Sequence, residues 1–257
     1  MRVAASARGR ALSAANRLLS VAGLTISRSP RRPAPRVRHP DVWEKVQAFT
    51  MTDAARVDAL YDCTRQLVDH GVPGDFVECG VYRGGSSMAM ALGLLEAGSD
   101  TRTLWLFDTF EGMTEPTSRD VKLKNGAVAA TKFEVLRTGP NSADWCAAPL
   151  DEVAQNMRST GYPTQNLRLV KGPVEETLLG ELPDRIALLR LDTDWYASTR
   201  VEMERLYPRL SPGGVLIIDD YNSWAGARKA VDEYLETQAI RLVFFPVGGG
   251  SVMTVVP

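Results

Sequence analysis

The chain has 257 residues, of which 44% are hydrophobic and 24% are charged. This is the composition of an ordinary globular protein, and it excludes a wholly disordered chain, a collagen and a membrane bundle. The three cysteines show no CxxC spacing, so neither a zinc site nor a disulfide framework is supported, and a cytoplasmic location is expected.

The net charge of −1 conceals an asymmetry between the N-terminus and the rest of the chain. Residues 1–38 contain nine arginines and no acidic residue, whereas the remainder holds all 31 acidic residues and 21 of the 30 basic ones. Residues 1–40 are therefore predicted as an arginine-rich tail, disordered or in a short helix, that allows weak contact with a membrane surface. The acidic body, residues 41–257, has no basic stripe, so nucleic acid is not expected as a partner.

Helical and strand patterns alternate along this body. The predicted order is helix 52–70, strand 75–80, helix 86–97, strand 103–108, an irregular segment 112–148, helix 150–159, strand 166–172, helix 174–179, strand 186–192, helix 198–210, strand 215–220, helix 225–235, and a closing hairpin from 241–246 and 251–256. The strands are rich in Val, Ile and Leu, which is typical of a parallel sheet covered by helices on both faces. The sequence thus predicts an α/β, doubly wound, Rossmann-like fold, with a mostly parallel seven-stranded sheet and an antiparallel edge.

Glycines follow the first predicted strand, in the segment ECGVYRGGSS at 78–87. A glycine turn lets the backbone approach a ligand closely, and the helix that follows offers free N–H groups. Asp108 ends the second strand, where a carboxylate can accept hydrogen bonds from ribose hydroxyls. These features together indicate a nucleoside site. The dinucleotide fingerprint GxGxxG is absent, and both NAD and S-adenosylmethionine remain open as ligands.

Carboxylates gather after two later strands. Asp192 and Asp194 follow the strand at 186–192, and Asp219 and Asp220 end the strand at 215–220. In a parallel sheet the carboxyl ends of neighbouring strands meet at the same edge, about 4.8 Å apart, so these acids can converge. A set of carboxylates without histidine or cysteine suits Mg²⁺ or a similar hard divalent ion. Loop acids and helix caps are the alternative reading of each acid taken singly.

Four ordered motifs resemble the macrocin O-methyltransferase family. They are FVECGVYRGGS at 76–86, FDTFEG at 107–112, LDTDWYAST at 191–199 and GGVLIIDDY at 213–221. The resemblance implies a class I fold and a methyltransferase that depends on S-adenosylmethionine and Mg²⁺. Members of the family methylate sugar hydroxyls in antibiotic biosynthesis, so the implied substrate is a small-molecule glycoside, macrolide-like, and a homo-oligomer is compatible with this reading.

The resemblance also implies roles for single residues. Asp194 is the expected general base, and Asp192, Asp219 and Asp220 are the expected metal ligands, with the division of roles between Asp192 and Asp194 left open. The residues expected to bind S-adenosylmethionine are Glu78, Gly80, Tyr82, Ser86, Asp108 and Gly172. Five aromatic residues are expected at the end of the sheet where the acids lie, either as core packing or as a wall for a glycosidic ligand. They are Trp145, Trp195, Tyr196, Tyr221 and Trp224.

Three rival hypotheses are kept. An NAD-dependent oxidoreductase would use the same fold, although the missing GxGxxG counts against it. A catalytically inactive binding or partner protein would keep the fold without needing the four acids. A methyltransferase acting on a glycolipid or a cell-surface glycan would differ from the leading hypothesis in its substrate, with the arginine-rich tail resting on anionic lipid.

Overall fold

The computed structural model describes residues 37–257; residues 1–36, and with them the predictions for most of the arginine-rich tail, lie outside the described residues. The described chain begins with α2 (Pro40–Val46), the 3₁₀ helix η2 (Gln47–Phe49) and α3 (Ala54–Asp69). Asp53 caps α3, because its side chain accepts a hydrogen bond from the Arg56 N–H. The helix α2 is an addition to the predicted elements.

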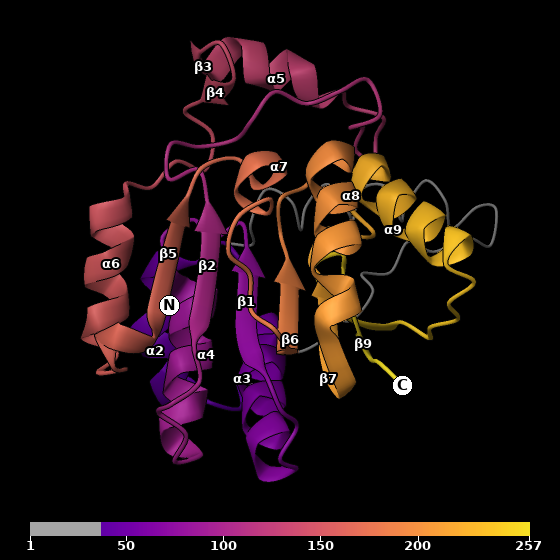
Figure 1. The fold of residues 1–257 in the computed structure, drawn as a ribbon. Helices are drawn as coiled ribbons and strands as arrows, with labels where there is room; N and C mark the ends of the chain where they lie inside the picture. Colours follow the sequence, from indigo (N-terminus) through magenta and orange to yellow (C-terminus); the bar gives the residue numbers. More distant parts are fainter. Residues whose placement is uncertain (1–36) are drawn as a thin grey trace, which may run out of the picture. The chain divides into compact units, whose positions relative to one another are not determined.

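Seven strands form one sheet in the order β5-β2-β1-β6-β7-β9-β8 (Figure 1). Five neighbouring strands run parallel: β5 (Leu167–Lys171), β2 (Leu104–Asp108), β1 (Asp75–Cys79), β6 (Ile186–Leu191) and β7 (Leu210–Ile218). The closing hairpin of β8 (Phe245–Gly248) and β9 (Ser251–Val255) adds β9 antiparallel to β7. The predicted fold class is confirmed, including the antiparallel pairing at one side of the sheet.

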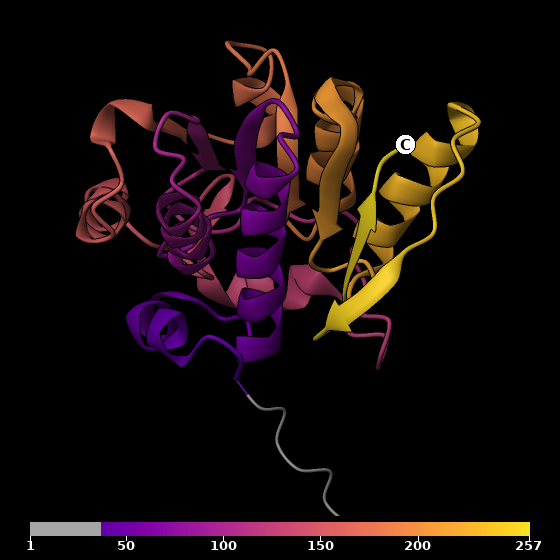
Figure 2. The ribbon, with the colours of Figure 1, turned by 90° about the horizontal axis from the view of Figure 1, so that it is seen from below.

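Helices cover both faces of this sheet, as seen from the side in Figure 1 and along the strands in Figure 2. Alternate residues of β1 face opposite layers: Phe76 packs in the cluster that includes α3, and Val77 in the cluster on the other face. The first cluster holds apolar residues of α2, α3, α4 (Gly85–Glu96) and α6 (Leu150–Ser159). The second holds those of α7 (Val174–Thr177), α8 (Tyr196–Arg205) and α9 (Ala225–Thr237).

The segment 112–148, called the lid segment below, lies beyond the carboxyl ends of the strands (Figure 1). It was predicted to be irregular, and the structure corrects this in part, because it contains α5 (Ala129–Leu136) and a small sheet of β3 (Arg137–Gly139) and β4 (Ser142–Ala143). Phe133 of α5 is fully buried with Trp145, Trp195 and Trp224. The helix thus depends on side chains that come from other parts of the chain, which a local pattern does not reveal.

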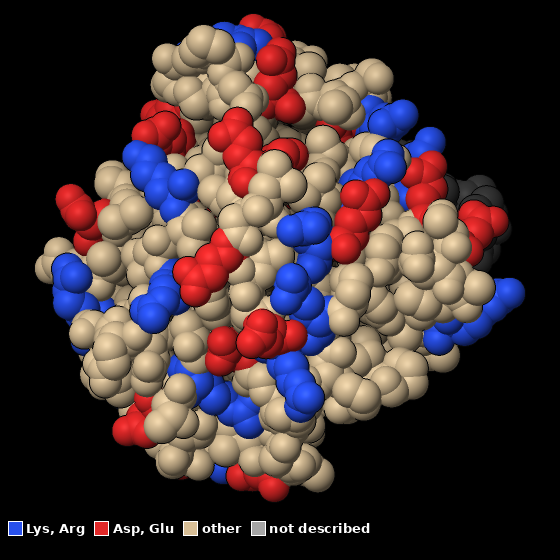
Figure 3. All heavy atoms as spheres, viewed as in Figure 1, with Lys and Arg blue, Asp and Glu red and all other residues tan. Residues whose placement is uncertain are grey.

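Among residues 37–257, no helix is long and apolar enough to cross a membrane. Acidic and basic side chains are interspersed on the face shown in Figure 3, with a short row of basic side chains near its centre.

Candidate functional site

A cavity of about 350 Å³ opens beyond the carboxyl ends of the parallel strands. This volume lies within the range of small-ligand sites, roughly 300–1,000 Å³. It is lined by the turn after β1, the ends of β2 and β5, the loops after β6 and β7, and the lid segment. The cavity thus occupies the place where open α/β sheets bind ligands.

Gly80 lies at a tight point of the cavity wall. It has a φ of +83°, and a Cβ at this position would lie 2.1 Å from the main-chain oxygen of Asp192. Strands β1 and β6 approach each other here, since the Asp192 N–H donates to the Cys79 oxygen at 2.8 Å. Only glycine fits both the conformation and the space, so this residue sets how closely the first turn can approach the acidic loop after β6.

Asp108 holds the same turn from the neighbouring strand. Its Oδ2 accepts hydrogen bonds from the N–H groups of Val81 and Tyr82 at 2.6 and 3.0 Å, and its Oδ1 accepts from the Phe110 N–H at 2.8 Å. Burial raises the pKa of Asp108, and these hydrogen bonds oppose the rise. Oδ1 also accepts from the Thr109 hydroxyl at 3.4 Å. The carboxylate, which offers about four acceptor sites, therefore has partners within the protein at all of them, and its contact with ribose stays a prediction.

The expected cofactor residues divide into two groups. The first group lines the cavity and consists of Gly80, Tyr82, Ser86, Asp108 and Gly172. Glu78 does not line it, because its side chain is turned into the sheet, where Ser87 donates to Oε2 and Arg190 to Oε1. The direct contact of Glu78 with the cofactor stays a prediction, and the structure gives its side chain two partners inside the protein.

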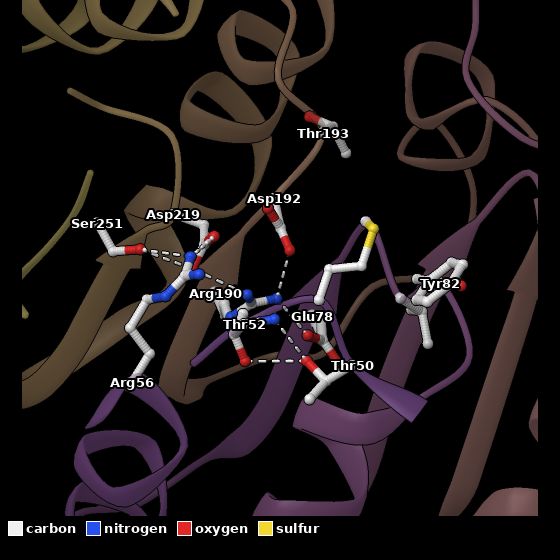
Figure 4. Close-up of polar contacts among 12 residues, drawn as sticks. Thr50, Thr52, Arg56, Glu78, Tyr82, Arg190, Asp192, Thr193, Asp219 and Ser251 are labelled. Carbon is white, nitrogen blue, oxygen red and sulfur yellow. Dashed lines mark hydrogen bonds and ion pairs between the residues drawn. The ribbon is translucent and has the colours of Figure 1, made fainter. Parts of the chain in front are cut away.

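Arg190 lies at the centre of a buried ionic network (Figure 4). Its Nη1 lies 2.5 Å from Glu78 Oε1 and 2.8 Å from Asp192 Oδ2, and its Nη2 lies 2.9 Å from Asp219 Oδ1. The register places it opposite Glu78 of β1 and Ile217 of β7, so one guanidinium reaches acids of three adjacent strands. Its charge compensates carboxylates that would otherwise be costly to bury.

Asp219 is held on both oxygens. Oδ1 accepts from Ser251 at 2.8 Å and faces Arg190, while Oδ2 accepts from Arg56 Nη1 at 2.7 Å. Burial opposes ionisation, yet Arg190 and Arg56 hold the pKa of Asp219 below its ordinary value. Arg56 comes from α3, 163 positions earlier in the chain, which is why the sequence did not indicate it.

Three other carboxylates gather at the cavity, those of Asp192, Asp194 and Asp220, each with an oxygen within 4.8 Å of the others. Burial raises the pKa of Asp192 and of Asp194 well above the ordinary value; the negative charge of Asp220 adds to both shifts, whereas Arg190 opposes that of Asp192. Oxygen-only ligands so close together match the preference of a hard divalent cation, which would relieve their repulsion. The gathered set contains Asp194, which was predicted as the base, whereas Asp219 is turned toward the arginines.

Several residues at this cavity have an uncommon backbone conformation. Tyr82, Cys146 and Asp194 line the cavity and have φ values of +51°, +58° and +68°. Such conformations are costly for residues other than glycine, and they persist where the surrounding structure enforces them, which is frequent at functional sites. Their concentration here supports the assignment of the cavity as the functional site.

Behind the acidic loop lies a buried carboxyl group that has no basic partner among residues 37–257. Glu202 of α8 is fully buried, and its Oε1 accepts from the Thr193 hydroxyl at 2.8 Å. Burial raises its pKa to about 8. Because Thr193 lies between Asp192 and Asp194, this bond fixes the loop that presents them.

The lid segment is anchored by aromatic and polar contacts. Trp195 and Trp224 are 5.0 Å apart between ring centroids, and Trp145 lies 5.5 Å from Trp195. Fully buried Asp120 accepts hydrogen bonds from Thr117 and from the Tyr196 N–H at 2.8 Å. Of the five aromatic residues expected as a wall, only Trp145, Trp195 and Trp224 form one cluster, and of these Trp145 and Trp224 line the cavity.

Several lining residues were not predicted from the sequence. They include Arg56, Lys122, Lys132, Glu175 and Arg190. For Arg190 a signal was present, namely a charged residue inside the apolar run IALLRL. The others lie in helices or irregular segments and reach the cavity only through tertiary structure.

The sheet order, the glycine turn after β1 and the cavity beyond the strand ends define a class I methyltransferase. The family model for macrocin O-methyltransferase (TylF) matches residues 24–252. The chain belongs to this family and is an S-adenosylmethionine-dependent O-methyltransferase.

Similar proteins come from antibiotic biosynthesis. A tetracenomycin 4′-O-methyltransferase of Streptomyces olivaceus, whose full name specifies a dimethoxy-rhamnosyl substrate, is 40% identical over 75% of this chain and 69% of its own length. Demethyldecarbamoylnovobiocin O-methyltransferase of Streptomyces niveus is 34% identical over 73% of this chain and 68% of its own length. The solved structure of the O-methyltransferase NovP is 30% identical, covers 81% of this chain and 82% of its own, and superposes with a TM-score of 0.69.

Proposed function

We propose that this enzyme transfers a methyl group from S-adenosylmethionine to a sugar hydroxyl of a glycosylated natural product, macrolide-like, with the help of Mg²⁺. The observation that carries the proposal is the group of three carboxylates, Asp192, Asp194 and Asp220, at the cavity beside the glycine turn. A cavity of about 350 Å³ suits a small-molecule ligand rather than a polymer.

Asp192 and Asp220 are the first proposed ligands of the divalent ion. Asp219 is proposed as a third ligand, through the acceptor site that remains on Oδ2 beside its bond to Arg56. Arg190 fixes the orientation of Asp192 and Asp219 from inside the sheet. When bound, the ion lowers the pKa of a coordinated hydroxyl and compensates the gathered negative charge.

Asp194 is the proposed general base. Its carboxyl lies in the same group as Asp192 and Asp220, and burial beside Asp220 raises its pKa, which makes it a better proton acceptor. The positive φ of the residue points to a position that the surrounding structure enforces. Asp194 thus takes the hydroxyl proton as the new O–C bond forms and the bond between the methyl group and the sulfonium sulfur breaks, leaving S-adenosylhomocysteine.

The cofactor side of the cavity is proposed at Gly80, Tyr82, Ser86 and Gly172, with Asp108 holding the turn and proposed as the contact for ribose. The lid segment closes the other side and excludes water from the sulfonium donor. Positioning of the hydroxyl opposite the methyl group then supplies much of the rate.

The proposed acceptor sugar is a 6-deoxyhexose such as rhamnose, because the S. olivaceus relative is named for a rhamnosyl substrate. A panel of rhamnosides, assayed with S-adenosylmethionine labelled in its methyl group, tests this part. Incorporation into a rhamnoside is expected, and labelling confined to aglycone hydroxyls would contradict it.

The metal is tested by calorimetry, with Mg²⁺ titrated into the wild type, Asp220→Asn, Asp219→Asn and the control Asp184→Asn. Asp184 is exposed and lies outside the cavity, so its variant removes the same charge without touching the site. Saturable Mg²⁺ binding that is lost in Asp220→Asn and kept in the control is expected. An unchanged Asp219→Asn would remove Asp219 from the ligand set, and wild-type turnover in EDTA would exclude the metal role.

A further inference from the structure

We propose that the acceptor carries an anionic group next to its sugar and that Lys122 and Lys132 of the lid segment bind this group. The inference rests on the proposed function, since it specifies the acceptor of the same cavity. Both lysines line the cavity together with the acidic group.

The floor of the cavity is acidic, because Asp192, Asp194, Asp219 and Asp220 line it. By contrast, residues 117–133 of the lid segment carry mostly basic charged side chains. Between residues 117 and 133 it contains Arg119, Lys122, Lys124 and Lys132, and its one acid is Asp120. Asp120 is fully buried and bonded to Thr117 and Tyr196, so it offers no charge to the cavity. The positive charge of residues 117–133 is therefore not compensated within that stretch. The other acids of the lid segment are Glu115, Glu134 and Asp144, and the first two pair with Arg137.

Both lysine residues are exposed, and their ammonium groups lie over aromatic rings at the cavity. Lys132 Nζ lies 4.0 Å from the ring centroid of Trp145, and Lys122 Nζ lies 5.2 Å from that of Trp224. Both tryptophans are buried, with exposed fractions of 8% and 5%, so the rings are fixed platforms. The backbone of Lys122 also bridges to Trp224, which holds this part of the lid segment against the loop after β7.

Neither lysine has an acidic partner. No carboxylate of residues 37–257 lies within 4.0 Å of either ammonium, and residues 1–36 contain no Asp or Glu that could supply one. The other cavity cations, Arg56 and Arg190, are both paired with Asp219. The lysines are thus the cavity cations without a counter-charge in the described chain.

An ammonium next to a bound ligand loses water, and the aromatic face compensates this loss only in part. An anion on the ligand completes the compensation with charge-assisted hydrogen bonds. The floor acids are proposed to hold a divalent cation and to accept the hydroxyl proton, so the acceptor that complements both sides of the cavity is a sugar joined to an anion. Two sources fit, the diphosphate of a nucleotide sugar and the carboxylate of an aglycone.

Matched acceptors separate charge from shape. The test compares 4-carboxyphenyl α-L-rhamnoside with its uncharged 4-carbamoylphenyl counterpart, and adds dTDP-rhamnose as the diphosphate source. The wild type is expected to show a KM for at least one anionic acceptor about tenfold or more below that for the carboxamide, and this preference is expected to shrink with salt. The anionic acceptor with the lower KM assigns the source.

The variants are Lys122→Gln, Lys132→Gln, the double variant, and the control Lys124→Gln, which is exposed in the same segment and does not line the cavity. Each of the first two is expected to raise the KM for the anionic acceptor about threefold to tenfold, with the carboxamide unaffected. Equilibrium binding of dTDP-rhamnose, followed by tryptophan fluorescence, is expected to weaken in parallel.

No preference for an anionic acceptor in turnover and in binding, or an equal effect of Lys124→Gln, would overturn the inference. Failure of the proposed function is distinguishable from this result. In that case Mg²⁺ calorimetry shows no binding and no rhamnoside is methylated, charged or uncharged.

Discussion

The floor of the cavity and the lid segment are built on different principles. The floor acids project from strands or from the residues directly after them, and Arg190 ties β1, β6 and β7 together beneath them. The lid segment depends on a tryptophan cluster and on Asp120, which bonds to the start of α8. The floor is thus coupled to the stability of the whole sheet, whereas the lid segment can be altered with the sheet intact.

The largest expected effect concerns the chemistry of the floor. Asp194→Asn removes the proposed base and is expected to lower kcat about 10²–10⁴-fold, with the cofactor Kd unchanged. Mg²⁺ binding is expected to persist in this variant and to be lost in Asp220→Asn, so rate measurements and calorimetry separate the two roles. Equal loss of Mg²⁺ in both variants would make Asp194 a ligand.

The next prediction concerns the stability of the floor, which is expected to fall when the central cation, Arg190, is replaced. Arg190→Met leaves Glu78, Asp192 and Asp219 without the guanidinium and is expected to lower the free energy of unfolding by about 3–5 kcal/mol. Urea unfolding measures the change. The control is Arg200→Met, since Arg200 pairs with Glu204 on the exposed side of α8 and its loss should cost less than about 1 kcal/mol. Equal costs for the two variants would contradict the network's role.

The lid segment is tested with Asp120→Asn. The amide cannot accept all the hydrogen bonds from Thr117 and Tyr196, so a loss of about 1–3 kcal/mol is expected. The acceptor KM should rise, while Mg²⁺ and cofactor affinities stay unchanged. Asp144→Asn, an exposed change in the same segment, should alter none of these quantities. Reduced Mg²⁺ affinity in Asp120→Asn would show that floor and lid segment are coupled.

The last expected effect is spread over a range of pH and concerns Glu202 behind the floor. Burial raises its pKa from 4.5 to about 8, so the folded state binds a proton that the unfolded state releases within this interval. This group therefore lowers stability as the pH rises from 4.5 to 8, by up to about 1.4 kcal/mol per pH unit. Glu202→Gln should remove this part of the slope in urea unfolding at several pH values, and identical slopes would contradict it.

The difference between the floor, which follows from local sequence patterns, and the lid segment, which depends on tertiary contacts, also explains what the sequence could predict. The apolar strand Ile186–Leu191 and the acids after it are local patterns, so the sheet and the position of the acidic floor were predictable. Strand alternation did not reveal that Glu78 faces Arg190, because that pairing joins residues 112 positions apart. The helix α5 was missed because its buried Phe133 packs against tryptophans that the fold alone brings near.

The position of Ser251 has a consequence for biosynthesis. This residue begins β9 and donates to Asp219, whose other oxygen is bound by Arg56, a residue from near the start of the described chain. A growing polypeptide has Arg56 outside the ribosome long before Asp219 and Ser251 emerge. The contacts around Asp219 are therefore complete only when nearly all of the described chain has been translated, so this part of the floor forms late during synthesis.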